Sequence, residues 1–201
     1  MPREQCSRMF ATANPSDGGF DVRGLMSKKQ NAPEAKAADV ASIDAIITAA
    51  YNVISGPVGK ARDWDRERSL FIPGARLIPT AKKAGGDDVD LATGRVRPNG
   101  GLAPHILDVD AYIARVEPYF QKNGFFEKEI ARRTEQFGNI AHVWSTYESR
   151  HNADDPEPFM RGINSIQLFH DGSRWWIVSI YWQQESTDCP TPEKYLESVK
   201  N

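Results

Sequence analysis

The segment at residues 173–184, which follows a turn at Asp171 and Gly172, constrains the fold of this chain more than any other part. Successive side chains of a β-strand point to opposite faces, so strict alternation divides this segment into two sets. One face carries Trp175, Ile177, Ser179 and Tyr181, and the other carries Trp176, Val178, Ile180 and Trp182. An antiparallel strand with water on one side alternates apolar with polar residues instead. We therefore predict a strand that packs against a partner on each face.

The last part of the chain has the pattern of a meander of four long strands. These strands are expected at about 125–137, 140–151, 159–170 and 174–184. Gly-Asn at 138–139 and Asp-Gly at 171–172 are typical of two-residue hairpin turns, whereas the connection at 152–158 is longer and more polar. Helices precede this meander, and that order is typical of the α+β class. We expect the helices to cover one face of a strongly curved sheet.

Three helices are predicted before the meander, from apolar residues at spacings of three and four. They are expected at about 39–54, 63–71 and 108–122. Asp39 and Asp63 are the expected N-terminal caps of the first two helices. Pro118 indicates a kink or the final turn of the third helix.

Two short strands and a long irregular stretch are predicted between the helices. Residues 75–80 are expected to form a strand, and Pro79 favours an edge position because proline has no backbone N–H to donate. Residues 102–107 are expected to form a second short strand. Residues 83–101 are rich in Gly and Asp, which predicts a long loop or a loosely paired arm, and whether it acts as a lid is left open.

We expect one domain, at residues 39–188, between two tails. Residues 1–38 show neither helical nor strand periodicity, which predicts a disordered N-terminal tail, and residues 189–201 are expected to form a C-terminal tail. Within the first tail, Met26 is a candidate alternative start of translation.

Charge and cysteine content exclude several classes of partner. The formal net charge of -2 provides no basic stripe, so neither nucleic acid nor a membrane surface is expected as a partner. Cys6 and Cys189 form neither a disulfide framework nor a zinc-ligand spacing. No run approaches the roughly 20 apolar residues of a spanning helix, and the N-terminus lacks the apolar region of a signal peptide. A cytoplasmic location is the default expectation.

Four segments carry a resemblance to a known family, at residues 43–51, 63–75, 137–143 and 172–178. Together with the element order, they resemble the nuclear-transport-factor-two-like (NTF2-like) superfamily, and within it the SnoaL-like domains. The resemblance implies a cone-shaped, strongly curved, mainly antiparallel sheet wrapped around about three N-terminal-side helices, with a pocket at its open end. It also implies a homodimer through the outer sheet face. The expected interface residues are Trp176, Val178, Ile180 and Trp182.

Three residues are weak candidates for catalysis. His142 and Glu148 share one face of the strand at 140–151, and on the pocket side they would serve as general acid and base. The alternative, which we favour, is structural pairing with Arg or Lys of neighbouring strands, and Arg132, Arg133 and Arg161 are candidate partners. The resemblance to ketosteroid isomerases makes Tyr51 an approximate match to a tyrosine that donates to an oxyanion, against the alternative of a core tyrosine.

Two further groups of acidic residues are not expected to form a catalytic or metal site. Asp63 and Asp65 flank a helix start, where capping explains them. The acidic residues at 87–90 lack the glycine and terminal glutamate of a calcium loop, so no metal site is expected there. No dinucleotide or phosphate-binding motif is present, and no cofactor is expected.

The leading functional hypothesis is a domain that binds an apolar or amphipathic small molecule in the cone. The expected pocket-lining residues are Tyr51, Trp64, Trp144, Gln167, Ser179 and Tyr181. A cofactor-free acid–base enzyme of the isomerase, dehydratase or cyclase type is an alternative. An assembly module whose cone is filled by side chains is a second alternative. Whether the protein is an enzyme is left open at this point.

Overall fold

The computed structural model describes residues 32–82, 88–89, 96–97 and 102–197. Most of the predicted N-terminal tail, including Met26, lies outside the described residues, and so does most of the stretch at 83–101. Residues from Ala32 onward form one compact unit, which is described here.

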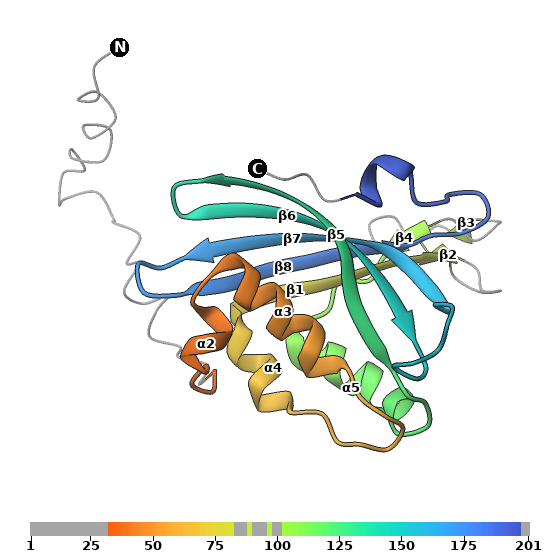
Figure 1. The fold of residues 1–201 in the computed structure, drawn as a ribbon, viewed down its shortest axis with the longest axis horizontal. Helices are drawn as coiled ribbons and strands as arrows, with labels where there is room; N and C mark the ends of the chain where they lie inside the picture. Colours follow the sequence, from red (N-terminus) through yellow and green to blue (C-terminus); the bar gives the residue numbers. More distant parts are fainter. Residues whose placement is uncertain (1–31, 83–87, 90–95, 98–101, 198–201) are drawn as a thin grey trace, which may run out of the picture. The chain divides into compact units, whose positions relative to one another are not determined.

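The described chain has four helices, eight strands and one 3-10 turn. In order they are α2 (Ala37–Val40), α3 (Ile43–Ile54), α4 (Trp64–Leu70), β1 (Phe71–Lys82), β2 (Asp88–Val89), β3 (Val96–Arg97), β4 (Leu102–Pro104), α5 (Val109–Phe120), β5 (Phe126–Phe137), β6 (Ile140–Arg150), β7 (Met160–His170), β8 (Trp175–Gln184) and η1 (Glu193–Tyr195). Helices α3, α4 and α5 lie on one face of the sheet (Figure 1). The predicted α+β class is confirmed.

The main sheet has six strands in the order β4-β1-β8-β7-β6-β5. Its pairs are antiparallel except β1 with β8, which is parallel. The predicted edge position of Pro79 is wrong, because β4 and the residues after it pair outside β1. Here the backbone N–H of His105 donates to the carbonyl oxygen of Pro79 at 2.9 Å. Proline thus takes part in the sheet through its acceptor alone.

The predicted first helix is divided into two. Helix α3 begins at Ile43, because the Ser42 hydroxyl oxygen caps it by accepting from the backbone N–H of Ala45 at 3.1 Å. Asp39, the predicted cap, instead pairs with Arg66 of α4 at 2.7 Å. The short α2 precedes the break and starts inside the predicted tail. The Asp63 cap of α4 is confirmed, since its carboxylate accepts from the backbone N–H of Arg66 at 2.9 Å.

A β-bulge in β8 changes which side chains face the helices. Ile177 pairs with Leu168 and Ser179 with Gln167, so Val178 is an extra residue in β8. Alternation resumes after the bulge with the opposite phase. The helix-facing residues of β8 are therefore Trp175, Ile177, Ile180 and Trp182.

This bulge corrects the predicted faces of the strand. Ile180 and Trp182 were assigned to an outer interface, but they pack against the core beneath the helices. Ser179 and Tyr181 were assigned to the inner face, but they lie outside, where Tyr181 is 46% exposed. Strict alternation is wrong here because it assumes an unbroken register, and one inserted residue exchanges the two faces.

The C-terminal segment packs on the outer face of the sheet, opposite the helices (Figure 1). The Thr146 hydroxyl of β6 donates to the carbonyl oxygen of Tyr195 at 2.6 Å, and the Trp144 and Tyr195 rings lie 5.8 Å apart. The residues predicted as a C-terminal tail therefore include an ordered turn, η1, that covers part of this face.

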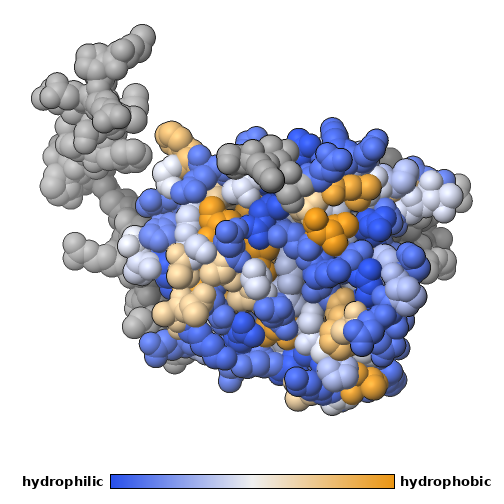
Figure 2. Space-filling view, in the orientation of Figure 1, coloured by the Kyte–Doolittle hydropathy of each residue, from blue (hydrophilic) through white to orange (hydrophobic). Residues whose placement is uncertain are grey.

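Apolar side chains on the face seen in Figure 2 occur in small groups separated by polar residues. None of the helices among the described residues is long and apolar enough to span a membrane.

Candidate functional site

A cavity of about 320 Å³ lies between helices α3, α4 and α5 and the concave face of the sheet. Its walls are largely apolar and aromatic, with a small number of polar groups. The lining residues are Ala50, Tyr51, Ile54, Glu67, Leu77, Tyr112, Arg115, Val116, Tyr119, Phe120, Phe125, Glu127, Tyr147, Met160, Asn164, Ile166, Ile180 and Trp182. A volume of this size, with few polar groups among apolar walls, is typical of small-molecule sites.

Glu67 of α4 is a buried acid in the cavity wall. It lies three residues from both Trp64 and Leu70, so the helix places its carboxyl on the same face as these apolar residues. Glu67 is only 3% exposed, and its Oε2 has no hydrogen-bond partner among the described residues. Burial raises the pKa of Glu67 to about 8, although the charge of Arg66 acts in the opposite direction.

Glu127 of β5 is the second acid in the wall. Its Oε2 accepts a hydrogen bond from the Ser149 hydroxyl of β6 at 2.8 Å. Burial raises the pKa of Glu127 to about 7, and the hydrogen bond from Ser149 partly offsets this rise. Two carboxyl groups that titrate near neutrality therefore share one cavity, an arrangement typical of functional sites.

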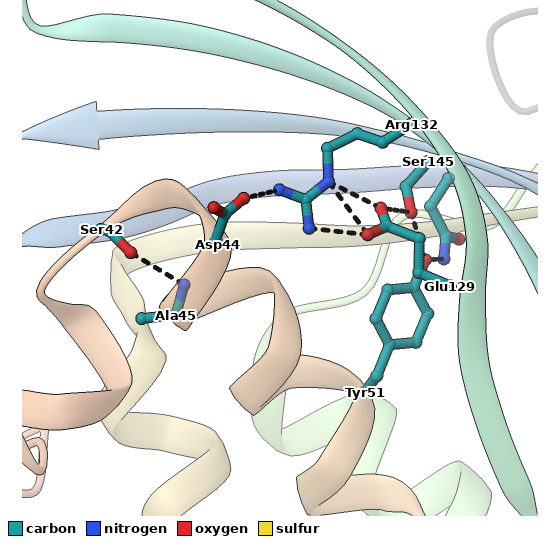
Figure 3. A network of polar contacts seen from close by, with 8 residues as sticks. Ser42, Asp44, Ala45, Tyr51, Glu129, Arg132 and Ser145 are labelled. Carbon is teal, nitrogen blue, oxygen red and sulfur yellow. Dashed lines mark hydrogen bonds and ion pairs between the residues drawn. The ribbon is translucent and has the colours of Figure 1, made fainter. Parts of the chain in front are cut away.

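A chain of hydrogen bonds connects the cavity with the protein surface (Figure 3). Arg132 pairs with the exposed Asp44 and donates to both carboxylate oxygens of Glu129, at 2.9 and 2.6 Å. The Ser145 hydroxyl donates to Glu129 Oε1 at 2.5 Å. The hydroxyls of Ser145 and Tyr51 are 2.7 Å apart, so the chain ends at a side chain that lines the cavity.

The direction of these hydrogen bonds follows from the number of protons. Ser145 has one hydroxyl proton and donates it to Glu129, so Ser145 accepts the proton of Tyr51. The Asn164 amide also donates to the Tyr51 oxygen, at 3.0 Å. Tyr51 therefore presents an acceptor and no free proton to the cavity. Its predicted role as an oxyanion donor is not supported, and burial together with the charge of Glu127 raises its pKa.

Tyr147 of β6 presents a hydroxyl with no hydrogen-bond partner among the described residues, although the residue is only 1% exposed. It lies opposite Gly162 of β7. A Cβ atom on Gly162 would lie 2.6 Å from the Tyr147 hydroxyl and 2.4 Å from the Gln183 carbonyl oxygen. Glycine at this position therefore leaves the room that the tyrosine side chain occupies.

Two of the predicted catalytic residues lie on the outer face, away from this cavity. Glu148 pairs with Lys128 at 3.1 Å and with Arg150 at 2.5 Å. His142 Nε2 is 3.0 Å from the Ser165 hydroxyl. The favoured structural interpretation matches these contacts, although the arginines proposed as partners of Glu148 were others.

Of the predicted pocket residues, only Tyr51 lines the cavity under the helices. Trp64 stacks on Phe120 and donates its indole N–H to Glu117 at 3.2 Å. The bulge places Ser179 on the outer face, where its partner Gln167 lies through the ordinary alternation of β7. Trp144 and Tyr181 line a second cavity, of about 310 Å³, between the outer face and the C-terminal segment.

The sequence interpretation missed the two acids of the wall. A signal for Glu67 was present, because helical spacing places it between Trp64 and Leu70 on an apolar stripe. Glu127 shares a strand face with Phe125, which is a weaker signal. Asn164 was not singled out either, since its partner Tyr51 is 113 residues away in the sequence. Within the described residues, no group of three or more His, Cys, Asp or Glu side chains is arranged to hold a metal ion.

The element order and the six-stranded, mostly antiparallel sheet give the chain an α+β fold, the class that the resemblance implied. No protein-family model matches the sequence. No curated protein matches it at a significant level.

Three solved structures illustrate the similarity of fold. An NTF2-like protein of unknown function from Silicibacter pomeroyi DSS-3 shares 19% identity, with a TM-score of 0.42, over 72% of this chain and 94% of its own. Another from Shewanella baltica OS155 shares 13% identity, with a TM-score of 0.37, over 71% and 90%. A protein from Xanthomonas campestris, described as a putative calcium/calmodulin dependent protein kinase II association domain, shares 12% identity, with a TM-score of 0.42, over 88% and 94%. These similarities concern the fold and say nothing of ligand or activity.

Proposed function

We propose that this protein binds an amphipathic small molecule in the cavity between the helices and the concave face of the sheet. The single observation that carries the proposal is an open cavity of about 320 Å³ whose apolar walls contain buried, incompletely paired polar groups. An unpaired buried polar group costs free energy, and a bound molecule would supply the missing hydrogen bonds. The open cavity also argues against the assembly module with a filled cone.

Native mass spectrometry of the purified protein tests this proposal. We expect a bound small molecule that the variant Ala50→Phe no longer retains, because the larger side chain fills the cavity. The matched control is Ala114→Phe, an exposed position on α5 that does not line the cavity. Equal ligand content in the wild type and both variants would place the ligand elsewhere and contradict the proposal.

Acid–base catalysis is a second candidate function, favoured by the raised pKa values of Glu67 and Glu127. A carboxylate in an apolar site can remove a proton from the carbon beside a ketone, and the second carboxyl can donate to the enolate oxygen. Exchange of the methyl protons of 2-acetylnaphthalene in D₂O, followed by NMR, measures this activity. We expect Glu127→Gln to abolish catalysed exchange and Glu135→Gln, an exposed residue of β5, to leave it unchanged. Exchange no faster than in buffer would exclude this candidate.

A further inference from the structure

We infer that the ligand of this cavity is an organic cation, an amine attached to an aromatic or alicyclic body, bound by Glu67 and Glu127. The inference rests on the proposed binding function and names the chemical class of its ligand.

Two acids and one cation, Arg115 of α5, line the cavity. Among the residues that the structure describes, none of the ion pairs includes Glu67 or Glu127. Arg66, next to Glu67 in the sequence, is occupied by Asp39 through hydrogen bonds of 2.7 and 2.9 Å. Arg62, which lies just before the start of α4, donates hydrogen bonds of 2.8 and 2.7 Å to backbone carbonyl oxygens. A cationic ligand would supply the missing counter-charge.

Several polar atoms that face the cavity can accept hydrogen bonds from a ligand. Tyr51 has committed its proton to Ser145 and presents only an oxygen lone pair, as derived above. The Asn164 amide donates one of its two N–H groups to Tyr51, and its carbonyl oxygen can accept. Glu67 Oε2 and the Tyr147 hydroxyl have no partner within the described part of the chain. A ligand group with several N–H donors matches this set, and an ammonium group has three such donors.

The walls suit a cation that carries an apolar body. Aromatic rings surround the acids, and a cation over a ring face is attracted by its electron density. The aromatic lining residues are Tyr51, Tyr112, Tyr119, Phe120, Phe125, Tyr147 and Trp182. Tyr112 and Trp182 meet edge to face with ring centroids 6.1 Å apart, so α5 and β8 close one side of the cavity. A volume of about 320 Å³ accommodates a ligand of one or two rings.

Three probes that share one ring system test the inference by isothermal titration calorimetry. They are 2-naphthylmethylamine, 2-naphthalenemethanol and 2-acetylnaphthalene, which differ only in the polar group. We expect the amine to bind at least about tenfold more tightly than either neutral probe, which corresponds to about 1.4 kcal/mol. If the alcohol or the ketone bound as tightly as the amine, the inference of a cationic ligand would be wrong, and the proposed binding function would still hold. Failure of all three probes to bind would overturn both.

Variants of the two acids test whether these residues cause the preference for the amine. We expect Glu67→Gln and Glu127→Gln each to weaken amine binding by about tenfold, because an amide cannot ionise to form an ion pair with the ammonium group, and to change alcohol binding little. Glu135→Gln, on the same strand as Glu127 but exposed, is the matched control. An amine preference that persists in both cavity variants would contradict the roles of these acids. Since the probe series uses the wild-type protein, it decides the question even where a variant fails to fold.

Discussion

Glu127 and Glu148 occupy neighbouring register pairs of β5 and β6, yet they lie on opposite faces of the sheet. Glu127 is opposite Ser149, and Glu148 is opposite Lys128. Glu127 faces the cavity, receives a hydrogen bond from Ser149, and has its pKa raised to about 7 by burial. Burial also acts to raise the pKa of Glu148, but hydrogen bonds from Arg150 and Lys128 outweigh it and lower the pKa.

The difference shows that the environment of a carboxyl decides its chemistry more than its residue type does. On the outer face, cations stabilise the ionised form, and the glutamate serves the structure. On the cavity face, apolar walls favour the neutral form until a partner arrives. The cavity acids are therefore available to a ligand, whereas the outer acid is already satisfied.

The largest predicted effect is on the pH dependence of stability. A variant of a cavity acid and a variant of the outer acid should respond to pH in opposite directions. Unfolded chains ionise glutamate near the ordinary pKa of 4.5, whereas folded Glu67 keeps its proton until about pH 8. Stability therefore falls as the pH rises from about 4.5 toward 8. We expect Glu67→Gln to raise the free energy of unfolding by roughly 2 to 4 kcal/mol at pH 8 and by far less at pH 5.

Glu148→Gln is the comparison for that experiment. Because the folded pKa of Glu148 is lowered, its contribution is present above pH 4.5 and is lost as the pH falls through the folded pKa. We expect this variant to lose about 1 kcal/mol at pH 7. Urea unfolding of both variants at several pH values checks the pair, and parallel pH profiles would contradict the assignment of the two faces.

The bulge at Val178 predicts different costs for two adjacent residues of β8. Trp182 packs under the helices, so Trp182→Ala should destabilise the protein by roughly 2 to 3 kcal/mol. Tyr181 is 46% exposed on the other face, and Tyr181→Ala should cost less than about 1 kcal/mol in an assay of denaturant unfolding. The reverse order of costs would mean that strict alternation describes the strand after all.

Two serines on opposite faces test the hydrogen-bond chain. Ser145→Ala removes the acceptor of the Tyr51 proton and one donor to Glu129, and we expect a loss of roughly 1 to 2 kcal/mol. Ser165→Ala removes only the contact with His142 on the outer face and should cost about 0.5 kcal/mol or less. Thermal unfolding measures both changes. Equal effects would show that the chain is not cooperative.

The homodimer through the outer face stays a prediction, and Val178 offers a probe with the smallest expected effect on the monomer. Val178 is 37% exposed at the bulge, so Val178→Glu should change monomer stability by less than about 0.5 kcal/mol. We predict that it lowers the mass measured by light scattering from dimer to monomer, because a charge opposes burial in an apolar interface. An unchanged mass would exclude Val178 from a dimer interface.

Much of the fold could be predicted because it depends on local patterns. Hairpin dipeptides and apolar spacing located the four long strands and the helices. The faces of β8 could not be predicted, since the bulge at Val178 arises from pairing with β7 and leaves no local mark. The break at Ser42 was missed because the apolar stripe continues across it.

Less of the candidate site could be predicted. Tyr51 lines the cavity, but the direction of its hydrogen bond depends on Ser145, 94 residues away. Glu67 lay on a recognisable apolar stripe, and that conflict between charge and position was the available signal. That Glu67 forms no ion pair within the described residues is a property of the packed structure, so sequence periodicity alone does not show it.

The central claim is that the cavity acids form no ion pair within the described part of the chain, and NMR titration of the ¹³C-labelled glutamate side-chain carboxyls tests it most directly. The account predicts that Glu67 titrates at about pH 8 and Glu127 at about pH 7, whereas Glu148 titrates below its ordinary value of 4.5. Titration of all three groups between about pH 4 and 5 would contradict it, because carboxyls with ordinary pKa values are solvated or already paired.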